Sequence, residues 1–260
     1  MKTIEKKAFF FDFDGTIWFG RFGEKTLKAL KDLHAQGHLL FYNSGRSKAN
    51  SRFDRLVEIP FDGFLFGGCH SESARGEVLY RSDISKEGIA LALDLEKQFD
   101  LLIIYEGVHG VYKRKGILPK FRAEELEDIS VLKDDKAYPM SKFSIIKKEL
   151  QCGYEPVPEQ VLERLSKHYI IIDLVNYVEC IQKGHGKDVI ILKTLEKLGL
   201  DVKNTYAFGD SLNDLPMFEV CQSSIAIGHS PSELKNLAVY VTKEEENGVW
   251  EALNALGFVE

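Results

Sequence analysis

The sequence predicts an α/β protein: a Rossmann-like doubly wound parallel sheet into which a second, α+β domain is inserted. At both ends of the 260-residue chain, short apolar runs alternate with segments of helical periodicity, the pattern of a parallel sheet with helices on its faces. Several of these runs end in polar or charged residues, which gather at one edge of such a sheet. Between residues 83 and 184 short strands outnumber helices, so this stretch is expected to form the inserted domain.

The first strand, expected over Ala8–Phe11, is apolar, aromatic and too short for a helix, which is typical of a buried strand. Two acids, Asp12 and Asp14, follow it at once, and then Gly15 and Thr16. Because removing a charge from water without a partner costs several kcal/mol, two acids at the end of a buried strand indicate a nearby cation. An ordinary Asp-Gly turn is the simpler alternative, and it stays open for this motif taken alone.

The second strand, expected over Leu39–Tyr42, leads into Asn43, Ser44, Gly45 and Arg46. A hydroxyl, a glycine that permits close backbone approach and a guanidinium meet there at the start of an expected helix. Backbone N–H groups and the helix dipole favour an anion at such a position. A serine N-cap is the alternative, and the two roles are compatible. The segment is therefore a candidate phosphate site.

A second cluster of acids follows the apolar run Thr205–Phe208. Asp210 and Asp214 are four residues apart, so a helix that begins near Ser211 places both carboxylates on one side. An EF-hand calcium loop is the weaker alternative, because the EF-hand pattern with its final glutamate is missing. One divalent ion can gather carboxylates from two strand ends, and oxygen-only ligands suit Mg²⁺.

A lysine opens the helix that is expected after Gly186 and closed by Gly199. Lys187 lies in the first turn of this helix, where a positive charge opposes the helix dipole. An anion bound at the same place would explain this position. A solvated lysine is the alternative, and Lys183 is the rival candidate.

The remaining elements follow from periodicity and from the positions of glycine and proline. Helices are expected over Lys25–Gln36, 47–58, Ser85–Gln98, Val157–His168, Pro231–Leu237 and Gly248–Leu256. Strands are expected over Gly63–Phe66, Leu101–Tyr105, Gly110–Lys113, Ser141–Lys147, Tyr169–Asp173, Val178–Gln182, Ser224–Ile227 and Val239–Thr242, with a hairpin through Glu77–Tyr80. The charged stretch Lys113–Pro139 is expected to be a surface loop with a short helix.

Together these motifs resemble the haloacid dehalogenase (HAD) superfamily, whose members are mostly phosphatases. Asp12-Phe13-Asp14-Gly15-Thr16 is similar to its first motif, and Ser44-Gly45-Arg46 to its second. Lys187 falls where the lysine of the third motif precedes a helix, with Asp188 in place of the glycine that often follows. Gly209-Asp210-Ser211-Leu212-Asn213-Asp214 closely resembles the fourth motif in its Cof-type (subfamily IIB) form.

The resemblance implies a domain organisation. The gap between the first two motifs holds only a loop and one helix, whereas a domain-sized stretch follows the second motif. In this family that spacing implies a C2-type cap, which covers the active site and selects the substrate. We expect a HAD-like catalytic core formed by residues 1–82 and 185–260, and an α+β cap domain formed by residues 83–184.

The resemblance also implies roles for the site residues. Asp12 would be the nucleophile that forms an aspartyl-phosphate, and Asp14 the general acid and base. The implied Mg²⁺ ligands are Asp12, Asp14 through its backbone carbonyl, Asp210 and Asp214, the last directly or through water. The implied phosphate-binding residues are Phe13, Ser44, Gly45, Lys187 and Asn213, with Arg46 as a further contact to phosphate or substrate.

The amino-acid composition argues against nucleic acid and membranes as binding partners. The net charge of −6 and the lack of a Lys/Arg-rich stripe argue against nucleic acid, and no apolar run is long enough to span a membrane. The four cysteines form no C-x-x-C pair, so they suggest neither a zinc site nor disulfides but the buried thiols of a cytoplasmic protein. We expect a cytoplasmic monomer or homodimer.

The motifs and the resemblance that they carry imply a Mg²⁺-dependent phosphatase that hydrolyses small phosphorylated metabolites, such as sugar phosphates or phosphorylated cofactors. Two alternatives stay open. A phosphomutase of the phosphomannomutase type would return the phosphoryl group to a sugar, and a non-catalytic protein would only bind a phosphorylated metabolite. A serine hydrolase and a P-loop kinase are excluded, because neither a G-x-S-x-G nor a G-x-x-x-x-G-K-[ST] motif is present.

Overall fold

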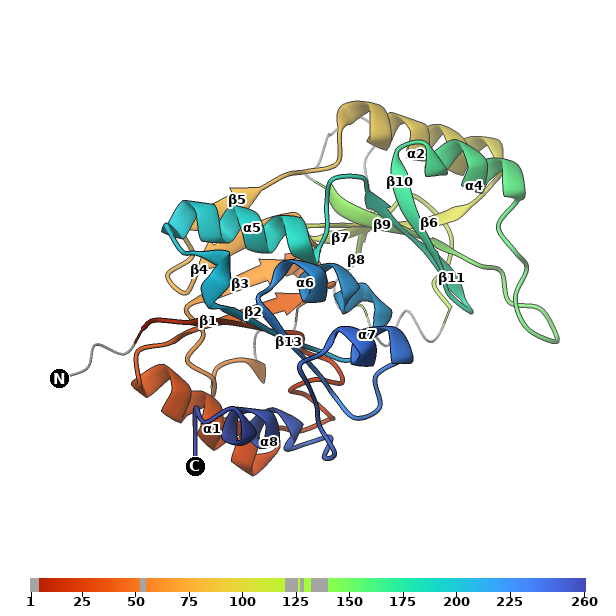
Figure 1. Cartoon of the computed structure of the whole chain (residues 1–260). Coiled ribbons are helices and arrows are strands. Elements are labelled where there is room, and N and C mark those ends of the chain that lie inside the picture. Colours follow the sequence, from red (N-terminus) through yellow and green to blue (C-terminus); the bar gives the residue numbers. More distant parts are fainter. Residues whose placement is uncertain (1–4, 52–54, 120–125, 127–128, 132–139) are drawn as a thin grey trace. The chain divides into compact units, whose positions relative to one another are not determined.

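The computed structural model describes residues 5–51, 55–119, 126, 129–131 and 140–260. The chain forms two compact units (Figure 1). The first unit comprises residues 1–45, 52–81 and 186–260, and the second unit comprises residues 46–51 and 82–185.

The first unit is built on a sheet whose described strands have the order β14-β13-β12-β1-β2-β3-β4-β5. Neighbouring strands are parallel except in the antiparallel ribbon β3-β4-β5 at one edge. Because the winding reverses at β1, the carboxyl ends of β1 and β12 mark a switch point, where ligands bind in such sheets. The strands are β1 (Ala8–Phe11), β2 (Leu39–Ser44), β3 (Gly63–Phe66), β4 (His70–Ser73), β5 (Val78–Arg81), β12 (Thr205–Gly209), β13 (Ser223–Ala226) and β14 (Tyr240–Val241).

Helices cover both faces of this sheet (Figure 1). One face packs against α1 (Glu24–Ala35) and α8 (Gly248–Ala255). The other packs against α5 (Lys187–Leu198), α6 (Leu215–Val220) and α7 (Ser232–Leu237). Among the described residues, no helix combines the length and the apolar character that crossing a membrane requires.

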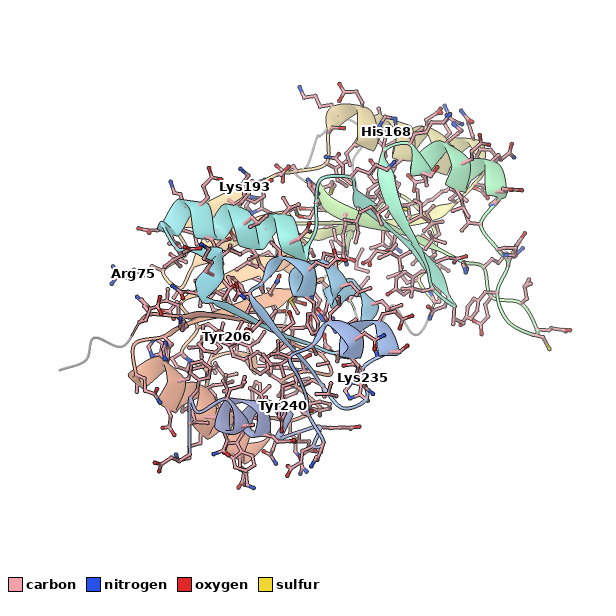
Figure 2. The ribbon with its side chains drawn as sticks, viewed as in Figure 1. Arg75, His168, Lys193, Tyr206, Lys235 and Tyr240 are labelled. Atoms are coloured by element: carbon pink, nitrogen blue, oxygen red, sulfur yellow. The ribbon has the colours of Figure 1, made fainter. Side chains whose placement is uncertain are left out.

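Strand β1 shows why its sequence is a continuous aromatic run. Phe9 and Phe11 pack into the core on the α1 and α8 side, whereas Phe10 packs on the α5 side. Successive side chains of a strand point to opposite faces, so a central strand buried on both faces is apolar at every position. The outer surface of α5 mixes charged residues with the exposed Leu192 and Leu198, and Lys193 lies there with its side chain half exposed (Figure 2).

The second unit contains a sheet whose described strands have the order β10-β11-β9-β6-β7-β8, all antiparallel pairs except β7 and β8. Two helices, α2 (Lys86–Gln98) and α4 (Glu159–Ser166), cover one face (Figure 1). The strands are β6 (Leu102–Gly107), β7 (Val111–Lys113), β8 (Ile129–Val131), β9 (Met140–Ile146), β10 (Tyr169–Asp173) and β11 (Tyr177–Gln182).

The opposite face of this second sheet carries charged residues. Along β9, Phe143 belongs to the core beneath the helices, so the neighbouring Lys142 points to the other face. The ammonium of Lys142 lies 2.5 Å from Glu179 Oε1, and the Ser47 hydroxyl donates to Glu106 Oε2 at 3.0 Å. Burying charges in this way requires partners, which these contacts supply.

The predicted fold class is confirmed, and most elements begin and end close to their expected residues. The helix expected over 47–58 is wrong for the residues that the structure describes there. They contain a short 3-10 turn, η1 (Lys48–Asn50), after which Ser51 is extended. The Ser51 hydroxyl donates to the Lys48 carbonyl at 2.7 Å, and a side-chain bond of this kind competes with helix formation.

The expectation that all cysteines are buried is wrong for one of them. Cys69, Cys180 and Cys221 are buried, but Cys152 is exposed. It lies in the connection between β9 and α4, and connections of this kind run over the surface. Much of the stretch Lys113–Pro139 lies outside the described residues, but the expectation of a loop with a short helix is wrong for Ile129–Val131. These residues form strand β8 and pair with β7, which satisfies their backbone hydrogen bonds in the sheet.

Candidate active site

The acidic residues meet at the carboxyl ends of the central strands. Strands β1 and β12 are parallel neighbours, and the Asp12 N–H donates to the Phe208 carbonyl at 2.9 Å. Asp12 is therefore the first residue after β1, and it lies beside the loop that carries Asp210 and Asp214. One carboxylate oxygen from each of these three aspartates lies within 4.8 Å of the others. The structure thus brings together both acidic clusters of the sequence.

Lys187 contacts two of these three aspartates. Its ammonium is 2.5 Å from Asp12 Oδ1 and 2.5 Å from Asp214 Oδ1, and its side chain is only 4% exposed. The rival Lys183 is exposed and belongs to the second unit. The ammonium of Lys187 therefore faces carboxylates rather than water.

Two glycines allow α5 to begin at this position. The Gly186 N–H donates to the Gly68 carbonyl at 3.2 Å. A Cβ atom on Gly68, whose φ is +69°, would lie 2.5 Å from the Gly186 nitrogen. The two backbones approach too closely for any side chain at Gly68, and this approach places the first residue of α5, Lys187, beside the acids.

Asp214 accepts three hydrogen bonds from the chain. Its Oδ2 accepts from the backbone N–H groups of Asp210 at 2.9 Å and Ser211 at 3.1 Å. Its Oδ1 accepts from Lys187. Asp214 therefore closes its own loop as part of a capping box with Ser211 and holds the lysine.

The Asp210 carboxylate is held on both oxygens. The Thr16 hydroxyl donates to Oδ1 at 2.8 Å, and His229 Nε2 lies 3.2 Å from Oδ2. Sequence reasoning did not assign His229 to the site. A signal for it exists, because His229 also follows the end of a parallel strand, β13, at the same edge of the sheet.

Asp14 differs from Asp12 in its environment. Asp14 is exposed, whereas Asp12 is buried. The Phe13 carbonyl accepts from the N–H groups of Ile17 and Trp18 at 3.1 and 3.0 Å, which forms a tight turn immediately after β1. The Phe13 ring packs in the core against Trp18, so only the backbone of Phe13 is available to a ligand.

Of the predicted phosphate-binding residues, Gly45 and Asn213 lie close together. A Cβ atom on Gly45 would be 3.5 Å from Asn213 Nδ2, so the loop after β2 reaches the loop after β12. Ser44 is buried at the end of β2. Asn213 is oriented by the Ser211 hydroxyl, which donates to its Oδ1 at 2.9 Å. Arg46 follows Gly45 in the chain but belongs to the second unit.

Burial governs the electrostatics of the cluster. Burial raises the pKa of Asp12 to about 8, against the Lys187 ammonium, which lowers it. Burial also raises the pKa of Asp210. The pKa of Lys187 is raised, because Asp12 and Asp214 outweigh the effect of its burial. Three carboxylates face one ammonium, so a divalent cation would balance the charge, and the all-oxygen donor set fits Mg²⁺.

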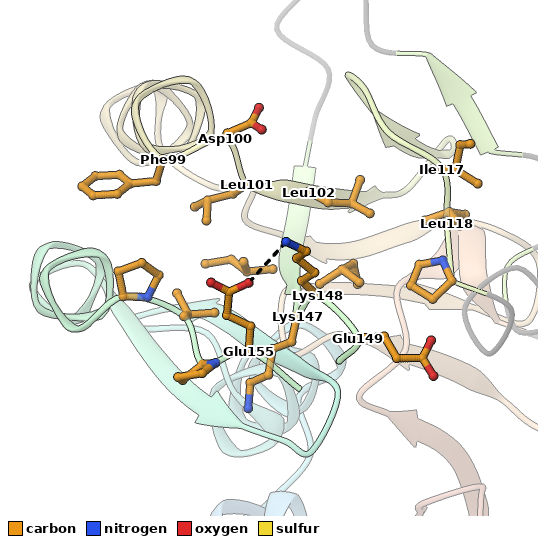
Figure 3. Close-up of a pocket in the computed structure, with 16 residues that line it drawn as sticks. Phe99, Asp100, Leu101, Leu102, Ile117, Leu118, Lys147, Lys148, Glu149 and Glu155 are labelled. Atoms are coloured by element: carbon orange, nitrogen blue, oxygen red, sulfur yellow. Dashed lines mark ion pairs between the residues drawn. The ribbon is translucent and has the colours of Figure 1, made fainter. Parts of the chain in front are cut away.

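A cavity of about 470 Å³ lies elsewhere, within the second unit (Figure 3). Apolar side chains such as Leu101 and Val157 line it, and Lys148 and Glu155 form an ion pair across it with an N–O distance of 3.9 Å. It contains no residue that the sequence assigned to catalysis or phosphate binding.

Comparison with known proteins identifies the family. A profile of the haloacid dehalogenase-like hydrolase family matches residues 9–253. YkrA of Bacillus subtilis (strain 168) is 31% identical, with 98% of this chain and 100% of YkrA covered. YcsE of the same organism, a 5-amino-6-(5-phospho-D-ribitylamino)uracil phosphatase, is 24% identical, with coverages of 97% and 96%. The solved structure of BT4131, a HAD subclass IIB sugar phosphatase, has a TM-score of 0.81 and 22% identity, with coverages of 98% and 100%.

The fold and the acidic site thus define an α/β enzyme of the phosphoric monoester hydrolase class. The chain belongs to the haloacid dehalogenase-like hydrolase family, and within it to the Cof-type phosphatases.

Proposed function

We propose that this protein is a Mg²⁺-dependent phosphatase that hydrolyses small phosphorylated metabolites through an aspartyl-phosphate. The observation that carries the proposal is the cluster of Asp12, Asp210 and Asp214 oxygens within 4.8 Å, with the Lys187 ammonium between two of them. Asp12, Asp210 and the Asp14 carbonyl would hold the ion. When bound, Mg²⁺ supplies positive charge that stabilises the anionic nucleophile and the transferring phosphoryl group.

In the first step a carboxylate oxygen of Asp12 attacks phosphorus and the bond from phosphorus to the leaving oxygen breaks. Asp14, exposed beside the buried nucleophile, donates its proton to the leaving alcohol. In the second step the Asp14 carboxylate takes a proton from water, whose oxygen attacks phosphorus and breaks the bond to Asp12. General acid–base help of this kind is worth about 10²–10⁴-fold in rate.

The phosphoryl oxygens would bind to Ser44, the Gly45 amide, Asn213 and Lys187. Gly45 and Asn213 support this assignment because they lie together although they follow different strands. Donors fixed before the reaction stabilise the developing charge without reorganisation. Asp214 already accepts three hydrogen bonds, which favours contact with the metal through water.

We assign residues 1–82 and 185–260 to the catalytic core and residues 83–184 to a C2-type cap that selects the substrate. The second unit is a sheet with two helices inserted between β5 and α5, which supports this assignment. YcsE acts on a phosphorylated ribitylaminouracil and BT4131 on sugar phosphates, so phosphate esters of polyols, sugars and cofactor precursors are the substrate class to test first.

The test is phosphate release from a panel of such esters, with Mg²⁺ and with EDTA. Wild type should release phosphate only with Mg²⁺, Asp12→Asn should release none, and Asp32→Asn, which changes an exposed acid in α1, should match wild type. Isomerisation of phosphosugars without phosphate release would identify a mutase instead. Unchanged turnover in Asp12→Asn would contradict the nucleophile assignment.

A further inference from the structure

A chain of contacts reaches Asp210 from two further loops of the first unit. His229 Nε2 lies 3.2 Å from Asp210 Oδ2, and His229 Nδ1 lies 3.7 Å from Glu245 Oε1. The Thr16 hydroxyl donates to the other Asp210 oxygen at 2.8 Å. The loops that follow β1 and β13 therefore contact this carboxylate, and the loop that follows β14 lies beside His229.

The loop that carries His229 is itself held in place. The Ile227 N–H donates to the Gly209 carbonyl at 3.1 Å, directly before Asp210. A Cβ atom on Gly228 would lie 2.7 Å from the Thr242 carbonyl oxygen, so this loop packs closely against the end of β14. The imidazole is thus presented to Asp210 by anchored backbone.

We propose that His229 is a positioning residue that fixes the orientation of the Asp210 carboxylate for Mg²⁺. This inference rests on the proposed function. A carboxylate has about four acceptor positions, so Asp210 can accept from Thr16 and His229 and still ligate an ion. Partners that orient a metal ligand in this way contribute about 10–100-fold to metal affinity or activity.

An imidazole suits this role because its two nitrogens lie on opposite sides of a rigid ring. Its Nε2 contacts Asp210, its Nδ1 lies 3.7 Å from Glu245 Oε1, and it packs against the Phe19 ring in a T-shaped arrangement with centroids 5.9 Å apart. Removing the ring would leave Asp210 with the Thr16 bond on one oxygen, so the plane of the carboxylate would be less well defined. Metal affinity would fall while the catalytic groups Asp12 and Asp14 stayed intact.

The test is direct binding of Mn²⁺, followed by electron paramagnetic resonance, together with activity as a function of Mg²⁺ concentration. His229→Ala should weaken Mn²⁺ binding about tenfold and raise the Mg²⁺ concentration for half-maximal activity about as much, with little change in kcat at saturating Mg²⁺. His229→Gln, which retains an N–H donor, should recover most of the affinity.

The matched control is His34→Ala, which removes another histidine that contacts an aspartate in the same unit, Asp62, at 3.6 Å. It should bind Mn²⁺ as wild type does, and thermal unfolding should show that all variants are folded. Wild-type Mn²⁺ affinity in His229→Ala, or no recovery of Mn²⁺ affinity in His229→Gln, would overturn the role of His229 and leave the metal site standing. Wild-type affinity in Asp210→Asn would overturn the metal site itself, which separates the two failures.

Discussion

Gly15 lies directly against the carboxylate of Asp210. A Cβ atom on Gly15 would be 2.6 Å from Asp210 Oδ2, and the φ of Gly15 is +84°. Two separate constraints therefore require glycine at this position of the first motif. Its backbone is left-handed, and the Asp210 carboxylate occupies the space that a side chain would need. This contact links the two motifs that bring the acids together.

Replacing Gly15 by alanine should damage the site as well as the fold. We expect a loss of more than about 1 kcal/mol in the free energy of unfolding, because alanine is strained at positive φ. We also expect at least about a tenfold loss of phosphatase activity, because the methyl group must displace Asp210. Urea unfolding and phosphate release measure the two effects.

Gly20→Ala is the control for this substitution. Gly20 has nearly the same φ, +83°, but a Cβ atom there would meet nothing within 4 Å. It should lose a similar amount of stability and keep its activity. Equal losses of activity in the two variants would show that backbone strain, and not contact with Asp210, is responsible.

Lys187→Met should be strongly destabilising. It leaves Asp12 and Asp214 buried side by side without the ammonium that both contact, and breaking a buried pair costs on the order of 3–5 kcal/mol. Activity should be lost as well. Lys183→Met, at the exposed rival lysine, should leave both stability and activity close to wild type, and a comparable loss there would refute the assignment.

Glu96 should make the protein less stable as the pH rises. Its side chain is 2% exposed, and burial raises its pKa although the Tyr105 hydroxyl, which donates to it, lowers it in part. A raised pKa in the folded state means that the contribution of Glu96 is fully present below its ordinary pKa of 4.5 and is lost above it. Glu96→Gln should therefore gain stability relative to wild type as the pH rises above 4.5, measured by urea unfolding.

Glu251 supplies the control of opposite sign. Partial burial raises its pKa, but hydrogen bonds from the Glu244 N–H, the Tyr240 hydroxyl and the Lys243 N–H lower it overall. Its contribution is present above the ordinary pKa and is lost as the pH falls. Glu251→Gln should thus lose stability relative to wild type as the pH rises. The same slope in both variants would contradict the sign of the Glu96 effect.

The charged pair on the second sheet should matter more than a surface pair of the same unit. Lys142→Met leaves Glu179 without an ammonium at a site where the lysine side chain is 9% exposed, so a cost of about 3 kcal/mol or more is expected. Lys148→Met breaks the exposed pair with Glu155 and should cost less than about 1 kcal/mol. Similar values from denaturant unfolding would show that the Lys142 pair is solvated.

Much of the fold could be read from local pattern. The aromatic run of β1 and the acids that follow it reflect burial on both faces and a shared sheet edge, which are local consequences of strand geometry. Of the helix expected over 47–58, the described residues Lys48–Asn50 form only a 3-10 turn, and the Ser51 hydroxyl donates to the Lys48 carbonyl, a kind of bond that competes with helix formation. The exposure of Cys152 depends on which loop lies at the surface, and residue type does not encode that.

The sequence by itself determined the α/β class, the order of the motifs and the residue types of the site. Only the tertiary structure decided which of two lysines faces Asp12, that Gly15 touches Asp210, and that His229 belongs beside the acids. The physical reason is that strand and helix periodicity act over a few residues. Contacts at the sheet edge, in contrast, join loops separated by most of the chain, and these contacts exist only after the strands have paired.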